Sequence, residues 1–124
     1  MKALHTKSAP AAIGPYSQAI EVNGFVFASG QIPIDPATRE FVEGGIKEQT
    51  RQALTNAARI MAEAGIDLSH VVKTTVFLAD MADFAAMNEV YSTFFKEPFP
   101  ARSAVAVKAL PKGALVEVEC VAVK

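Results

Sequence analysis

FPARSAVAV, residues 99–107, is the stretch around which the rest of the chain is organised. Its small and β-branched residues predict a strand from Arg102 onward. An arginine in apolar surroundings costs several kcal/mol unless a carboxylate or carbonyl oxygens accept its hydrogen bonds. Two interpretations follow. Arg102 is either a structural residue that reaches water or pairs with Glu117 or Glu119, or it is an anchor for the carboxylate of a ligand.

Length and composition predict one globular domain that spans residues 1–124. Apolar residues make up 51% of the chain and charged residues 20%, a balance typical of folded domains of this size. The net charge is −1 and no basic block occurs, which argues against a nucleic-acid-binding protein.

Targeting, redox and metal signals are weak in this sequence. No apolar run is long enough for a signal peptide or a membrane span. The single cysteine, Cys120, excludes an intrachain disulfide, so we expect a cytoplasmic protein. His5 and His70 have no cysteine or histidine neighbours at ligand spacing, and we therefore expect neither a metal nor another cofactor.

Side-chain periodicity predicts the element order β-β-α-β-α-β-β. Asn23-Gly24 is a strong signal for a tight hairpin, residues 32–45 are expected to be a loop, and Gly65 is placed to end the first helix. Asp80 is expected to cap the second helix, which should carry Phe94 and Phe95 and end before Pro98. The expected strands cover residues 16–22, 25–29, 71–78, 102–107 and 115–123, and the first helix covers residues 46–64.

Alternation along residues 115–123 divides the last strand between two faces. One face is apolar and includes Cys120, which is therefore expected to be a core residue; the other carries Glu117 and Glu119 together with apolar side chains. Two helices can cover only one face of such a sheet. Because the second face is too apolar for water alone, we expect an oligomer, with a site at the subunit interface as a hypothesis.

Five stretches taken together resemble the Rid/YjgF family, and within it the RidA-type enamine/imine deaminases. The resemblance runs over essentially the whole chain, in order and with natural spacing. Each motif alone is weak, but the set is specific. The stretches are AAIGPYSQA at 11–19, ASGQIP at 28–33, VKTTVFL at 72–78, FPARSA at 99–104 and VEVE at 116–119.

The resemblance implies a chorismate-mutase-like α+β fold: a mixed sheet of five to six strands, with two helices packed on one face. It also implies a homotrimer with sites in the clefts between subunits. The implied reaction is the hydrolysis of reactive enamine/imine acids, above all 2-aminoacrylate, released by pyridoxal-phosphate enzymes. The products are a 2-oxo acid and ammonia.

The family's functional residues fall on five positions of this chain. Arg102 would bind the substrate carboxylate through two hydrogen bonds, assisted by the amide of Gly30. Glu117 would orient the attacking water and manage its proton. Tyr16 and Ser29 would position the substrate. Burial should raise the pKa of Glu117 and Arg102 should lower it, and the balance between them is open.

Three further positions complete the implied site. Phe84 and Asn88 match residues that line the family's pocket. Ala104 is a departure, because the best-known members have a cysteine at this position. A thiol mechanism is therefore excluded here, and any role for Ala104 must come from its backbone carbonyl.

Two other functions compete with the deaminase. The same cleft could capture 2-oxo acids or other small carboxylates as a regulatory module, which would need Arg102 but not Glu117. An RNA-cleaving activity, also associated with the family, is disfavoured by the neutral charge and the absence of a basic-aromatic patch.

Overall fold

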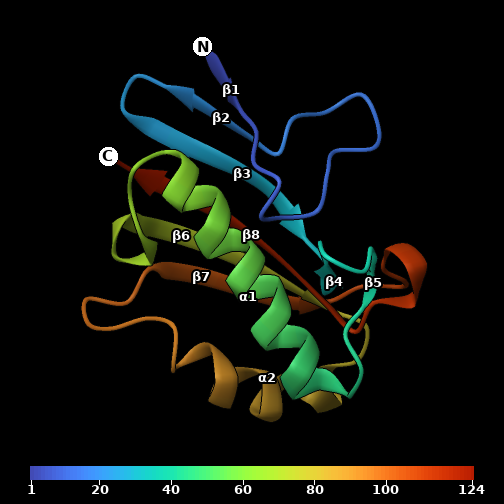
Figure 1. The fold of residues 1–124 in the computed structure, drawn as a ribbon. Coiled ribbons are helices and arrows are strands. Elements are labelled where there is room, and N and C mark those ends of the chain that lie inside the picture. Colours follow the sequence, from blue (N-terminus) through green and yellow to red (C-terminus); the bar gives the residue numbers. More distant parts are fainter.

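The computed structural model describes residues 1–124, and its centre is a six-stranded mixed sheet (Figure 1). The strand order is β1-β2-β3-β8-β6-β7; β6 and β7 are parallel, and the other neighbours are antiparallel. The strands are β1 Lys2–Leu4, β2 Ala19–Val22, β3 Phe25–Gln31, β6 Val71–Leu78, β7 Ala101–Ala106 and β8 Val116–Val123.

Two helices, α1 Ile46–Glu63 and α2 Phe84–Tyr91, lie side by side on one face of this sheet (Figure 1). The core forms between them and the sheet because both carry an apolar stripe. Leu54, Ile60 and Met61 of α1 are fully buried. They pack in one cluster with alternate residues of β8, from Val116 to Ala122. The α+β architecture with two helices on one face is thus confirmed.

Two glycine-containing turns form as predicted. Asn23 and Gly24 both have positive φ, at 51° and 80°, as a type I′ hairpin between β2 and β3 requires. Gly65, at φ 80°, ends α1 in the left-handed conformation. Both turns are local, and each depends on a residue that adopts positive φ at little energetic cost.

The first strand of that hairpin begins later than expected, at Ala19 rather than Tyr16. The amide of Tyr16 donates to the carbonyl of Gly14 at 2.8 Å. This narrow turn, next to a proline with no N–H of its own, diverts the chain from the sheet. Residues 14–18 are therefore irregular.

Four other features differ from the expectation. A short hairpin, β4 Ile34–Asp35 with β5 Glu40–Phe41, lies within the expected loop, and β1 was not expected. Asp80 caps a 3₁₀ turn at Met81–Asp83 that leads into α2. α2 ends early, at Tyr91. The hydroxyls of Ser92 and Thr93 donate to carbonyls three residues earlier, at 2.8 and 2.6 Å, and compete with the helical pattern.

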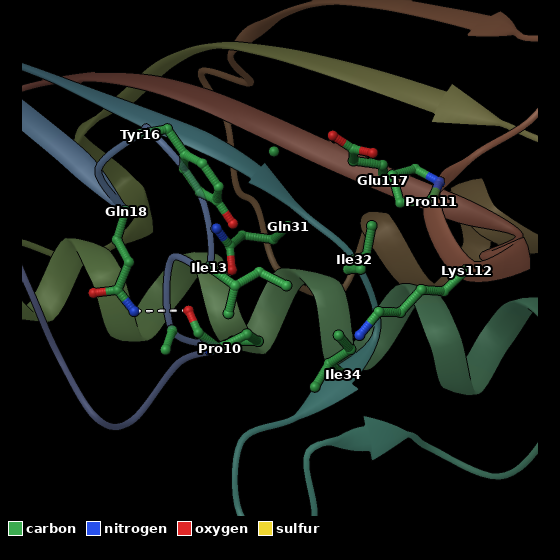
Figure 2. Close-up of a pocket in the computed structure, with 12 residues that line it drawn as sticks. Pro10, Ile13, Tyr16, Gln18, Gln31, Ile32, Ile34, Pro111, Lys112 and Glu117 are labelled. Carbon is green, nitrogen blue, oxygen red and sulfur yellow. Dashed lines mark hydrogen bonds between the residues drawn. The ribbon is translucent and has the colours of Figure 1, made fainter.

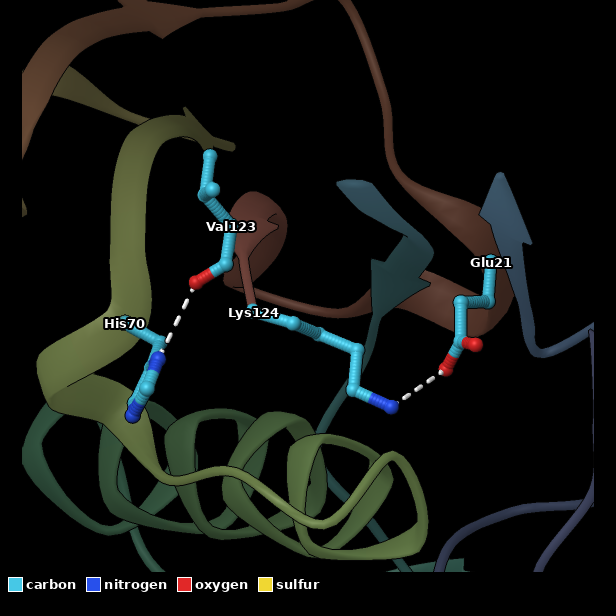
Figure 3. A network of polar contacts seen from close by, with 4 residues as sticks. All are labelled: Glu21, His70, Val123 and Lys124. Carbon is cyan, nitrogen blue, oxygen red and sulfur yellow. Dashed lines mark hydrogen bonds and ion pairs between the residues drawn. The ribbon is translucent and has the colours of Figure 1, made fainter. Parts of the chain in front are cut away.

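The far end of β8 is tied to two neighbouring segments (Figure 3). The imidazole Nδ1 of His70 lies 3.0 Å from the carbonyl oxygen of Val123. Lys124 donates its backbone N–H to Gly24 at 2.8 Å and pairs its ammonium with Glu21 at 3.1 Å. The last strand is thereby held against the hairpin on one side and the start of β6 on the other.

The face of the sheet opposite the helices is open and partly apolar. Phe25, Phe27 and Val105 are 42%, 46% and 46% exposed, and Val123 is 37% exposed. The two phenylalanine rings stack with centroids 5.9 Å apart. An apolar strip of this kind is typical of a subunit interface. The oligomer remains a prediction, and this strip is the surface through which we expect it to form.

Neither helix is both long and apolar enough to cross a membrane.

Candidate active site

The predicted site residues fall into two groups on opposite faces of the sheet. Arg102 pairs in register with Thr74, which is fully buried beneath the helices. Glu117 alternates with the buried residues of β8 and pairs with Phe77 on the open side. An ion pair between Arg102 and Glu117 or Glu119, one form of the structural interpretation of Arg102, is therefore absent within a single chain.

Arg102 is held by α2. Its Nη1 donates to Oδ1 of Asn88 at 2.7 Å. Its guanidinium carbon lies 5.4 Å from the ring centroid of Phe84 and 4.7 Å from that of Tyr91, at cation–π distance. No carboxylate pairs with Arg102, and Asn88 accepts its one side-chain hydrogen bond within the chain. A guanidinium carries five N–H donors, so most of its donors remain free for a ligand.

Tyr91 also belongs to this group, although it was not among the site residues expected from the sequence. Its hydroxyl shares a 2.7 Å hydrogen bond with Oγ1 of Thr74. Burial raises the pKa of Tyr91, against the opposing effects of Thr74 and Arg102. The ring is thereby fixed beneath the guanidinium. The spacing of Phe84, Asn88 and Tyr91 is i, i+4, i+7, which places all three on one helix face and could have identified Tyr91.

Glu117, Gly30 and Tyr16 form the second group, around a pocket of about 220 Å³ (Figure 2). The Glu117 carboxyl group lies directly over Gly30, where an added Cβ would be 2.8 Å from Glu117 Cδ. The pairing of β3 with β8 shifts register between Ala28 and Gln31, which is typical of a β-bulge beside a site. Tyr16 is 53% exposed, and its hydroxyl has no partner within the chain. Its ring is therefore available to a ligand.

The environment of Glu117 raises the pKa of its carboxyl group. Burial raises the pKa of Glu117, and the nearby charge of Glu119 raises it further. Within one chain Arg102 does not oppose this, because it lies on the other face of the sheet. A carboxyl group with a raised pKa is better suited to exchange a proton with water near neutral pH.

Ser29 and Ala104 lie outside this pocket lining. The Ser29 hydroxyl donates to the carbonyl oxygen of Ser17 at 2.6 Å, and its amide donates to Gln18 at 2.9 Å. Ser29 therefore anchors the segment that carries Tyr16. Ala104 follows Arg102 by two residues on β7, faces the helices and packs against the core.

Gln18 is a residue of the pocket that we did not expect. It is 3% exposed, and its side chain binds the backbone of the loop before Tyr16. Nε2 donates to the carbonyls of Thr6 at 3.0 Å and Pro10 at 2.8 Å, and Oε1 accepts from the Thr6 amide at 2.7 Å. Figure 2 shows the bond to Pro10.

Two buried amide side chains on α1 hold other backbone segments near the pocket; Ile32 and Ile34 line it, whereas Leu115 lies two positions before a lining residue. Asn56 donates to the carbonyls of Ile32 and Ile34 at 3.2 and 2.9 Å. Gln49 accepts from the Leu115 amide at 2.8 Å. Both are polar side chains at core-facing positions of a helix, and this signal was available in the sequence.

Comparison with known proteins agrees with this geometry. The family model described as Endoribonuclease L-PSP matches residues 6–124. The mouse 2-iminobutanoate/2-iminopropanoate deaminase is 50% identical over 123 residues, covering 99% of this chain and 91% of the mouse protein.

Two crystal structures resemble the chain over nearly its whole length. RidA from the Antarctic bacterium Psychrobacter sp. is 46% identical, with a TM-score of 0.96 and all of both chains covered. TdcF from E. coli with bound serine is 42% identical, with a TM-score of 0.95, and the match covers 100% of this chain and 99% of TdcF. The chain therefore belongs to the Rid/YjgF family.

Proposed function

We propose that the protein is a hydrolytic deaminase of small enamine/imine acids, such as 2-iminopropanoate and 2-iminobutanoate. Its products are the 2-oxo acid and ammonia. The observation that carries the proposal is Arg102, a partly buried arginine without a carboxylate partner and with most of its donors free. The deaminase name of the mouse relative and the serine in the TdcF structure support a small substrate that bears a carboxylate.

The two groups of residues act together only across a subunit interface. β7 is two strands away from β8 in the sheet, a separation of about 10 Å, and Arg102 and Glu117 face opposite sides. A three- or four-carbon substrate does not span that distance through a sheet. We therefore assign Arg102, Phe84 and Asn88 of one subunit and Glu117 of its neighbour to one site, in a homotrimer that buries the open face.

In this site Arg102 binds the substrate carboxylate and fixes the position of the imine carbon. A water molecule attacks that carbon while the Glu117 carboxylate accepts a proton from the water. The protonated Glu117 then returns this proton to the nitrogen. As the carbon–nitrogen bond breaks, the remaining hydroxyl proton passes to the departing ammonia. The iminium group and one water thus become a ketone and an ammonium ion. The Gly30 amide and Tyr16 contact the substrate, and the chemistry needs no protein thiol at Ala104.

Ser29, Phe84 and Ala104 have supporting roles in this proposal. Ser29 holds the segment that carries Tyr16 and leaves its oxygen free to accept a hydrogen bond. The Phe84 ring shields the guanidinium from water, which strengthens its bond to a carboxylate. Ala104 offers its backbone carbonyl beside the arginine.

The test couples a pyridoxal-phosphate-dependent serine or threonine dehydratase to this protein and follows the decay of the imine absorbance. Wild type should accelerate the decay and Arg102→Ala should not. Arg51→Ala, which removes an exposed arginine of α1, is the matched control and should behave as wild type. If wild type has no effect with several amino-acid precursors, the deaminase proposal is refuted.

Glu117→Gln separates catalysis from simple binding. The deaminase mechanism predicts that this variant still binds a 2-oxo acid but has lost most of its rate. If wild type and Glu117→Gln are both inert and bind the 2-oxo acid equally, the protein is a carboxylate-binding module instead.

A further inference from the structure

A second pocket, of about 730 Å³, lies beside the one that contains Glu117. The N-terminal segment and the β4–β5 hairpin form its sides. The two pockets share a wall of five residues, namely Pro10, Ala11, Ile13, Ile34 and Lys112. Figure 2 shows the Lys112 side chain extending along this wall beside Ile34.

The ionisable side chains that line this second pocket are all basic. His5, Lys7, Arg39 and Lys112 line it, and none of its 11 lining residues is acidic. The whole chain carries 13 acidic and 12 basic residues, so the composition does not explain such an imbalance. None of these four side chains forms a hydrogen bond or an ion pair within the chain; both ion pairs of the protein use other residues.

Two of the four residues adopt a backbone conformation that disfavours side chains. Arg39 has φ 65° and Lys112 has φ 56°, in the left-handed region, which costs a residue other than glycine about 1 kcal/mol. Glycine would avoid this cost at both positions. Arg39 and Lys112 therefore carry long cationic side chains at positions where the backbone conformation favours glycine. Observed strain of this kind points to a role for the side chain.

We propose that this pocket binds the phosphate group of a small phosphorylated molecule. A phosphate has three oxygens and nearly two charges, and it accepts hydrogen bonds from several cationic donors at once. A concave hollow with four basic side chains fits one such group. A nucleic acid instead requires a track of cations along its backbone, and the chain as a whole has a net charge of −1.

In the experiment, isothermal titration calorimetry measures the binding of pyrophosphate at constant ionic strength. It compares wild type with Lys7→Met, Arg39→Gly and Lys112→Met. Each variant should weaken binding about two- to fivefold, within the range for a single exposed charge pair. Arg39→Gly accommodates the left-handed backbone, so its fold is preserved. Lys96→Met removes an exposed lysine outside the pocket and should bind as wild type.

Three outcomes would overturn the proposal. They are no saturable binding up to about 10 mM pyrophosphate, an equal loss of affinity in Lys96→Met, and tighter binding of an oligoribonucleotide that displaces pyrophosphate from the pocket. Because the measurement uses no imine substrate, its result is independent of the deaminase assay. The variants Lys7→Met and Arg39→Gly should also retain wild-type deaminase rates.

Discussion

Replacing Gln18 by leucine removes the side chain that holds the loop before Tyr16. The substitution keeps the approximate volume but eliminates three hydrogen bonds of 2.7–3.0 Å to the backbone of Thr6 and Pro10. Each such bond contributes about 1 kcal/mol, and a backbone group left without a partner in a buried place costs as much or more. We therefore expect the free energy of unfolding to fall by about 3 kcal/mol.

Urea unfolding at a fixed protein concentration measures this loss, since an oligomer unfolds in a concentration-dependent way. With a slope of about 1.5 kcal/mol per M, the midpoint should fall by about 2 M. Gln31→Leu is the matched control. Gln31 is 5% exposed, almost as buried as Gln18, but it donates a single hydrogen bond, to Ser29 at 3.1 Å.

The control should lose only about 1 kcal/mol. Equal midpoint shifts for the two variants would refute the reasoning, because the number of backbone partners would then have no effect. Gln18→Leu should also raise the KM for the imine more than it lowers kcat, as expected of a residue that positions Tyr16 without touching the reacting atoms.

Three further predictions concern the two groups of site residues. Gly30→Ala should abolish deaminase activity and lower the midpoint, because its Cβ would meet the Glu117 carboxyl group; activity near wild type would show that Glu117 is not held there. Glu117→Gln should raise the urea midpoint at pH 7, since burial raises the pKa of Glu117 and thus disfavours its charged form in the folded state. This gain should vanish as the pH falls below the unfolded-state pKa, about 4.3, where wild type is protonated as well, and a gain that persists at pH 3 would contradict this origin. Tyr91→Leu should raise KM about tenfold through loss of the ring beneath Arg102, whereas Tyr91→Phe should keep the KM and lose only the bond to Thr74; equal KM values for the two would exclude a positioning role.

Several features of the fold were predictable because they depend on short stretches of chain. The hairpin at Asn23-Gly24 and the helix end at Gly65 follow from residues that tolerate positive φ. The two faces of β8 follow from the alternation of side chains along a strand. The premature end of α2 was not predictable from its apolar stripe, because the hydroxyls of Ser92 and Thr93 compete with it locally.

The sequence by itself determined which residues are candidates for the site, because their types and motifs are read along the chain. Only the tertiary structure decided which of them meet. Arg102 faces α2 because β7 pairs with β6 in one particular register, with Arg102 opposite Thr74. A shift of one residue would turn it to the other face, toward Glu117. That register pairs Thr74 with Arg102, about thirty residues away along the chain, and depends on the packing of the helix that connects the two strands. No local pattern specifies it.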